Sequence, residues 1–203
     1  MNMRGHHGWI EVICGPMFSG KSEELIRRLR LAQIAKQRVQ IFKPAIDDRY
    51  DEEYITSHSE QKFLCTPVAD VEQILSNIRD TTRVVGIDEA QFFDESIVFA
   101  CERLANRGLR VILAGLDQDY LGNPFGPMPQ LLAIADSVSK NHAVCVVCGE
   151  PATKSQRLTE QSDQVVVASG EAYEARCRSC FDPDLSEESA RPAIPVSKAA
   201  ATA

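Results

Sequence analysis

The sequence of residues Ile10–Arg30, IEVICGPMFSGKSEELIRRLR, contains the pattern that decides the fold. Its apolar start, Ile10–Cys14, predicts a buried strand, and the residues from about Ser22 predict an amphipathic helix. Between them, GPMFSGKS at 15–22 matches G-x-x-x-x-G-K-[ST], the phosphate-binding loop. Backbone N–H groups of such a loop, and of the helix N-terminus that follows it, bind phosphate. The stretch therefore predicts a protein that binds a nucleoside triphosphate.

Two side chains of this loop have expected roles of their own. Lys21 adds a positive charge beside the terminal phosphates, and the Ser22 hydroxyl is placed to bind Mg²⁺. A glycine-rich turn could match the motif by chance, but the strand before it and the helix after it favour the functional interpretation. The residues predicted to contact the nucleotide are Gly15, Pro16, Met17, Phe18, Ser19, Gly20, Lys21 and Ser22.

A second apolar stretch, RVVGID at 83–88, ends in an acid and is followed by Glu89. Phosphate-loop enzymes use a carboxylate at a strand end to hold Mg²⁺ or its water shell, which we predict for Asp88. Glu89 is then placed to take a proton from an attacking hydroxyl as a general base. Two acids in a surface turn are the alternative, which the phosphate loop upstream makes less favourable.

Strands and helices are predicted to alternate as far as about residue 139. Further strands are expected over 38–43, 61–67 and 109–115, and helices over 22–36, 68–79, from after 93 to about 107, and 129–135. This order favours an α/β fold, a mostly buried parallel sheet with helices on both faces. Ligands of such sheets bind beyond the carboxyl ends of the strands, which favours the acidic segment 47–53 and the Gly-, Pro- and aromatic-rich segment 116–127 as parts of the site.

Four of the seven cysteines form two C-x₂-C pairs, at 145 and 148 and at 177 and 180. Four thiolates at this spacing predict a closed, structural Zn²⁺ site with ligands Cys145, Cys148, Cys177 and Cys180. The 28 residues between the pairs exceed the usual separation of about 15–20. A long lasso pinned at its base is therefore expected, with a strand at 164–168 and a turn at 169–170. The other cysteines, Cys14, Cys65 and Cys101, lie in apolar runs and are predicted to be buried.

Composition limits the class of protein. The 203 residues are 44% hydrophobic and 25% charged, with a net charge of −7, which argues against sequence-independent nucleic-acid binding. No stretch reaches the roughly 20 apolar residues of a membrane span, and the N-terminus lacks the apolar core of a signal peptide, so a cytoplasmic protein is expected. The predicted organisation is an N-terminal tail (1–8), a nucleotide-binding domain (9–140), a zinc-binding lasso domain (141–182) and a disordered C-terminal tail (183–203).

Together these motifs resemble the type II thymidine kinases, the cytosolic zinc-containing class. The resemblance covers about residues 8–181 and rests on GPMFSGKS, DRY at 48–50, GIDEAQFF at 86–93, LD…PFG from 116 to 126, and AVCVVCG with YEARCRSC. It implies a RecA-like nucleotide domain, and a lasso that closes over the nucleoside. The implied reaction is Mg²⁺-dependent transfer of the γ-phosphoryl group of ATP to the 5′-hydroxyl of thymidine or deoxyuridine, in nucleotide salvage and DNA precursor synthesis. Homotetramers and feedback inhibition by thymidine triphosphate are also implied.

The resemblance also implies roles for individual residues. Glu89 matches the catalytic base, and Asp47 and Arg49 match an acidic–basic pair near the transferred phosphate. Contacts with ATP extend from the loop to Asp88, Glu89, Ala90 and Gln91. The nucleoside pocket is matched by Met17, Phe92, Leu116, Tyr120, Phe125, Val167, Ala168, Ser169, Gly170 and Tyr173.

Three positions depart from the family pattern. Tyr120 replaces the Phe of the human enzyme, so its extra hydroxyl needs a partner, and Ala90 replaces a Gly. The lasso stretch VVVASGEAY lacks a Gly-Gly pair that many members have, which leaves the residue that hydrogen-bonds the base open.

Other classes of protein stay open at this point. A RecA-like ATPase with a zinc finger acting on nucleic acid is disfavoured because no basic stripe surrounds the cysteine pairs. A GTPase switch is disfavoured because the sequence has no N-K-x-D signature. A protein that only binds nucleotide is disfavoured by the presence of Lys21, Asp88 and Glu89 together.

Overall fold

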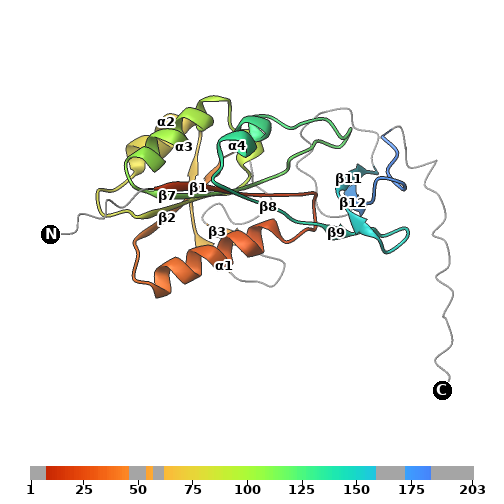
Figure 1. Cartoon of the computed structure of the whole chain (residues 1–203), viewed down its shortest axis with the longest axis horizontal. Helices are drawn as coiled ribbons and strands as arrows, with labels where there is room; N and C mark the ends of the chain where they lie inside the picture. The colour runs from red at the N-terminus through yellow and green to blue at the C-terminus, as the bar shows by residue number, and fades with distance from the viewer. Residues whose placement is uncertain (1–7, 46–53, 57–61, 159–171, 184–203) are drawn as a thin grey trace, which may run out of the picture.

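A parallel sheet forms the centre of the molecule. The computed structural model describes residues 8–45, 54–56, 62–158 and 172–183. Its main sheet has six strands in the order β5-β2-β6-β7-β1-β8, and all neighbours are parallel. The predicted α/β fold is thereby confirmed (Figure 1). The strands are β1 (Trp9–Cys14), β2 (Val39–Pro44), β5 (Thr66–Val68), β6 (Val84–Ile87), β7 (Arg110–Gly115) and β8 (Ser137–Lys140).

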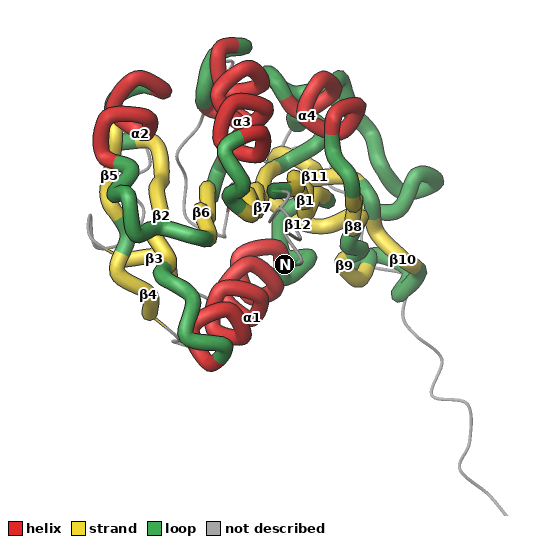
Figure 2. The backbone as a smooth tube through the Cα atoms, turned by 60° about the vertical axis from the view of Figure 1, so that its left-hand side comes forward, coloured by secondary structure: helices red, strands yellow, loops and turns green. Residues whose placement is uncertain are grey.

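Helices cover both faces of this sheet, as predicted. α1 (Lys21–Ile34) lies on one face, and α2 (Val71–Asn77), α3 (Ser96–Asn106) and α4 (Met128–Ile134) lie on the other (Figures 1 and 2). Successive side chains of a strand point to opposite faces, so a strand inside the sheet contributes side chains to the hydrophobic cores on both faces. On β1, Ile13 belongs to the cluster with α1, and its neighbour Val12 to the larger cluster with the other helices.

The structure differs from the prediction at the edges of the sheet. The single strand expected over 61–67 is two strands, because β4 (Lys62–Leu64) pairs with β3 (Tyr54–Thr56) whereas β5 joins the main sheet beside β2. The helix expected over 68–79 is shorter, because Val68 belongs to β5 and Asp70 caps α2 by accepting a hydrogen bond from Gln73 N. In the described ranges, no helix has the length and apolarity needed to cross a membrane.

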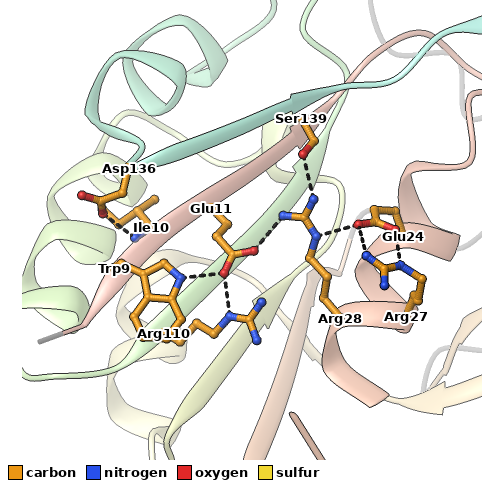
Figure 3. Close-up of polar contacts among 9 residues, drawn as sticks. All are labelled: Trp9, Ile10, Glu11, Glu24, Arg27, Arg28, Arg110, Asp136 and Ser139. Carbon is orange, nitrogen blue, oxygen red and sulfur yellow. Dashed lines mark hydrogen bonds and ion pairs between the residues drawn. The ribbon is translucent and has the colours of Figure 1, made fainter. Parts of the chain in front are cut away.

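A buried carboxylate on β1 ties α1 to the sheet (Figure 3). Arg28 of α1, which donates to Glu11, also donates to Glu24 on its own helix and to Ser139 on β8. Burial alone would raise the pKa of Glu11, but its hydrogen bonds outweigh that effect and hold the pKa below its ordinary value. Glu11 accepts hydrogen bonds of 2.6–2.7 Å from Trp9 Nε1, Arg28 Nη1 and Arg110 Nε.

Glu11→Gln is expected to lower the free energy of unfolding at pH 7 by about 2–4 kcal/mol, because Arg28 and Arg110 lose a buried counter-charge. A depressed pKa stabilises the folded state above the unfolded value of 4.5, and this contribution is lost as the pH falls through the folded pKa. Urea denaturation at several pH values should therefore show the difference from wild type shrinking towards acid. The control Glu102→Gln makes the same change on the exposed surface of α3. An equal loss in the control would contradict the prediction.

Candidate functional site

The predicted phosphate loop connects the carboxyl end of β1 with the first turn of α1. Phe18 and Gly20 take left-handed backbone conformations, with φ of 63° and 73°, and Gly15 has a φ of 141°. A Cβ at Gly15 would lie 2.4 Å from the carbonyl oxygen of Asn141, so a side chain would collide there with backbone. The loop therefore depends on glycine at its first position.

The structure places the end of this loop beside the acids that follow β6. Ser22 Oγ lies 3.5 Å from Asp88 Oδ1, and Lys21 Nζ donates to Pro16 O at 2.7 Å. Ser19 Oγ donates to the same carbonyl at 2.8 Å. Only β7 separates β1 from β6 in the sheet, so the loop and the acids share one edge. This edge offers a lysine, a hydroxyl and carboxylates within one site.

Asp88 and Glu89 have different environments although they are adjacent. The Asp88 side chain is buried and accepts a hydrogen bond from Glu89 N at 3.0 Å, whereas Glu89 is half-buried. Glu89 has a φ of 51°, a left-handed conformation that is costly for a non-glycine residue and that is often found at active sites. Burial first, and then the charge of Glu89, raise the pKa of Asp88 to about 7.

Without a divalent cation, the contribution of Asp88 to the free energy of unfolding should fall as the pH rises. The unfolded chain releases the Asp88 proton near pH 3.8, whereas the folded protein keeps it until about pH 7, so each increase across that window favours unfolding. Asp88→Asn removes this titration, and thermal melts in EDTA should show its midpoint exceeding that of wild type more at pH 8 than at pH 5. Asp80→Asn, at an exposed turn, is the matched control. A gap that does not change with pH would contradict the prediction.

Gln91 holds the Glu89 carboxylate from the short helix η1 (Ala90–Phe92). Its Nε2 donates to Glu89 Oε2 at 2.5 Å, and its Oε1 accepts from Leu116 N at 3.0 Å. Gln91 and Ala90 are buried, so the Gln91 side-chain amide, which makes both hydrogen bonds, is shielded from solvent. The sequence suggested a nucleotide contact for Gln91, and the structure shows that it orients Glu89 relative to the end of β7.

Two aromatic residues, one on η1 shortly after Glu89 and one on the segment that follows β7, contact each other. Phe92 follows Glu89 on η1, and its ring meets Phe125 edge to face, with centroids 5.8 Å apart. Phe125 is buried, whereas Phe92, Leu116 and Met17 are half-buried. The Phe92–Phe125 pair, and Leu116 through its hydrogen bond to Gln91, thus bring apolar side chains to the segment that carries Glu89.

Tyr120 and Tyr173, two predicted pocket residues that are distant in sequence, share one arginine. The guanidinium Cζ of Arg157 lies 3.5 Å from the centroid of the Tyr120 ring, a cation–π contact. Arg157 also donates from Nε and Nη2 to the Tyr173 hydroxyl, at 3.1 and 2.8 Å. Arg157 is not predicted from the sequence, because a single arginine in the polar stretch KSQR matches no motif.

The four paired cysteines come together in one cluster. The segments 141–158 and 172–183, which carry them, lie beyond one end of the sheet (Figure 1). We name residues 141–158 and 172–183 the cysteine module. It holds two antiparallel strand pairs that the sequence did not predict, because each strand is short and lacks apolar alternation. They are β9 (Ala143–Val144) with β10 (Pro151–Ala152), and β11 (Lys154–Arg157) with β12 (Tyr173–Arg176).

The geometry of these cysteines suits a metal ion. Their sulfur atoms all lie within 4.8 Å of one another, and a tetrahedral ion with bonds of about 2.3 Å requires sulfur separations of about 3.8 Å. Burial opposes ionisation of Cys145, but backbone N–H groups of Cys177, Cys148 and Val147 outweigh it and lower the pKa of this thiol to about 6. The four residues could therefore hold a metal. Cys14, Cys65 and Cys101 are buried, as predicted.

Several predicted site residues lie outside the described part of the chain. They are Asp47, Arg49, Val167, Ala168, Ser169 and Gly170, together with the expected strand at 164–168.

The sequence is similar to that of several known proteins. The sequence profile of a family described as Thymidine kinase matches residues 8–181. A protein named Thymidine kinase from Rhodothermus sp. (strain ITI 518) is 59% identical over 179 residues, which cover 88% of this chain and 84% of that protein. Proteins with the same name are 54% identical in Bdellovibrio bacteriovorus (88% of this chain, 87% of the relative) and 56% identical in Bacteroides thetaiotaomicron (86% and 87%).

Proposed function

The chain belongs to the thymidine kinase family, and from this premise we propose that it transfers the γ-phosphoryl group of ATP to the 5′-hydroxyl of thymidine or deoxyuridine, with Glu89 as general base. The protein is a thymidine kinase, and its substrates are thymidine and a nucleotide phosphate donor. One observation carries the finer assignment: the phosphate loop and the Asp88–Glu89 pair lie at the same edge of the sheet.

The donor site would use the chain's own charges and backbone. Backbone N–H groups of the loop at 15–22 would bind the phosphates of ATP together with the Lys21 ammonium, except at Pro16, which has no N–H, and at Met17, whose N–H donates to Ser155. Residues 88–91 would lie beside them, since Ser22 is next to Asp88. Ser22 Oγ and the Asp88 carboxylate lie side by side, an oxygen pair that fits Mg²⁺ held directly or through water. Mg²⁺, when bound with ATP, neutralises phosphate charge. Asp47 and Arg49 would act near the transferred phosphate, as the family resemblance suggests.

The acceptor site would lie next to Glu89, among apolar and aromatic side chains. Glu89 accepts the 5′-hydroxyl proton while Gln91 keeps its carboxylate in place. Gln91 is itself bound to Leu116 N, just after β7, so the Glu89 carboxylate has a fixed position from which it can orient the acceptor oxygen towards the γ-phosphate. The thymine would be enclosed by Met17, Phe92, Leu116, Tyr120, Phe125 and Tyr173, and its edge read by the backbone of Val167, Ala168, Ser169 and Gly170.

We assign Zn²⁺ to the four cysteines, because a set of four sulfur donors favours this ion and leaves it no open position for catalysis. Its role would be structural, pinning the lasso domain (141–182) against the nucleotide-binding domain (9–140). We also propose homotetramers and feedback by thymidine triphosphate, both from the family resemblance. A cytoplasmic location is supported by the seven cysteines, which all lie in the described residues and form no disulfide.

The test is a direct assay. Purified, zinc-loaded protein given ATP, Mg²⁺ and radiolabelled thymidine should form thymidine monophosphate, and EDTA should stop the reaction. Deoxyuridine should be accepted, whereas deoxyguanosine should be rejected because a lasso closed over a pyrimidine leaves no room for a purine. ATP hydrolysis that depends on added DNA, with no nucleoside monophosphate formed, would overturn the proposal in favour of a nucleic-acid ATPase.

A further inference from the structure

Residues outside the nucleotide-binding motif contact the phosphate loop just before its first position and at its third and fifth positions. Asn141 comes directly after β8, the edge strand beside β1, and begins the cysteine module. Its backbone N donates to Cys14 O at 2.8 Å, which continues the pairing of β1 and β8 to the start of the loop. Its side-chain Nδ2 donates to Ser19 O at 3.1 Å. One residue thus contacts both the residue before the motif and the fifth position of the motif.

The close approach at Gly15 shows how tightly this contact is built. A Cβ on residue 15 would lie only 2.4 Å from the carbonyl oxygen of Asn141. The absence of a side chain at Gly15 is therefore what allows the junction of β8 and the cysteine module to pack against the loop. Asn141 thus packs against the loop at Gly15 and is hydrogen-bonded to it at Ser19.

A second contact reaches the middle of the loop from β11. Met17 N donates to Ser155 Oγ at 2.9 Å, across 138 residues of sequence. Ser155 is buried and pairs with Ala175 on β12, the strand that leads to Cys177. Asn141, on the other side, precedes Cys145 on the same short stretch of chain. Asn141 is therefore joined to the cysteine site by the chain itself, and Ser155 through the pairing of β11 with β12.

We propose that Asn141 and Ser155 form a clamp by which the cysteine module holds the phosphate loop in its nucleotide-binding shape. They are positioning residues for the donor triphosphate, because Asn141 acts through the Ser19 peptide and Ser155 through the Met17 amide. The inference rests on the proposed function, since it takes the loop to be the ATP site. It assigns to the cysteine module a role in donor binding, beyond pinning the lasso over the nucleoside.

The main test is Asn141→Leu, which keeps a side chain of similar size and removes the Nδ2 donor. Loss of one hydrogen bond that orders the loop should raise the dissociation constant for Mg·ADP, measured by calorimetry without nucleoside, by about two- to tenfold. The KM for ATP should rise similarly, while the KM for thymidine stays near wild type. Asn106→Leu, at the exposed end of α3, is the matched control and should change neither.

Ser155 supplies an independent variant if Asn141→Leu does not fold. Ser155→Ala leaves the Met17 N–H without its acceptor and should weaken Mg·ADP binding by about two- to tenfold, whereas Ser155→Thr keeps a hydroxyl and should restore it. Ser137→Ala, on exposed β8, is the control. Unchanged Mg·ADP affinity in both Asn141→Leu and Ser155→Ala would overturn the clamp, as would an equal rise of both KM values in Asn141→Leu.

The calorimetric measurement separates this inference from the proposed function. A wild-type protein that binds Mg·ADP but forms no thymidine monophosphate would contradict the proposed reaction and still allow the clamp to be measured. A wild-type kinase whose nucleotide affinity is insensitive to Asn141 and Ser155 would overturn the clamp and leave the reaction intact.

Discussion

Glu89→Gln is expected to lower kcat for thymidine phosphorylation by about 10²–10⁴-fold, the usual contribution of a general base. The substitution preserves shape but removes the negative charge and, with it, the capacity to take a proton. Its carbonyl oxygen can still accept the hydrogen bond that Gln91 Nε2 gives to Glu89, and Lys21, Ser22 and Asp88 are untouched. Nucleotide binding should therefore persist. Initial rates with saturating substrates, together with calorimetric titration of Mg·ADP, measure the two effects separately.

Two further variants sharpen the assignment. Glu89→Asp keeps a carboxylate but withdraws it from the acceptor oxygen, so its activity should lie between wild type and Glu89→Gln. Glu95→Gln makes the same chemical change at an exposed position before α3 and should have normal activity. A Glu89→Gln enzyme with wild-type kcat would show that another group, or water, accepts the hydroxyl proton.

The parts of the site that the sequence predicted are those whose chemistry is local. The phosphate loop needs a strand, a glycine-rich turn and a helix in direct succession, so eight adjacent letters at 15–22 are enough to identify it. Asp88 and Glu89 were found because they end an apolar strand, and parallel strands bring their carboxyl ends to one edge. The paired cysteines were predicted as metal ligands because such ligands come in short, fixed spacings, and the structure brings their sulfur atoms together.

The parts that were missed depend on contacts between distant segments. β8 is polar and mostly exposed, so no periodicity marks it, and its place beside β1 follows from tertiary pairing. Arg157 is identified only by the two tyrosines that it touches, and these lie on other segments. Asn141 and Ser155 similarly match no motif, because their partners are backbone atoms of the phosphate loop.

Cys148→Ser is expected to reduce bound zinc from about one ion per chain to a small fraction and to lower thymidine phosphorylation by at least about 100-fold. The reason is that few large apolar side chains pack inside the cysteine module. Its apolar cluster consists of small residues, Ala143, Cys145, Ala152 and Ala175. Burial of so few carbons cannot replace a structural zinc site, whose binding contributes about 10–16 kcal/mol in small zinc domains.

The same variant tells whether the metal acts on one substrate or on both. The two large clusters of the sheet contain no residue of the cysteine module, so the α/β core should stay folded, with little change in far-ultraviolet circular dichroism. The module, once loosened, would release Arg157 from Tyr120 and Tyr173, which weakens thymidine binding. Release of the Asn141 and Ser155 contacts would also weaken Mg·ADP binding, but by less, because the loop keeps its own backbone and Lys21.

Zinc analysis, steady-state kinetics and Mg·ADP calorimetry on one preparation distinguish these effects. Cys101→Ala, which removes a buried thiol from α3, is the matched control and should keep full zinc content and nucleotide affinity. Unchanged zinc content in Cys148→Ser would show that the four-thiolate site is wrong. Loss of zinc with unchanged Mg·ADP affinity would show that the metal supports only nucleoside binding. The proposed clamp would then be wrong, because Asn141 and Ser155 should lose their contacts with the phosphate loop when the cysteine module loosens.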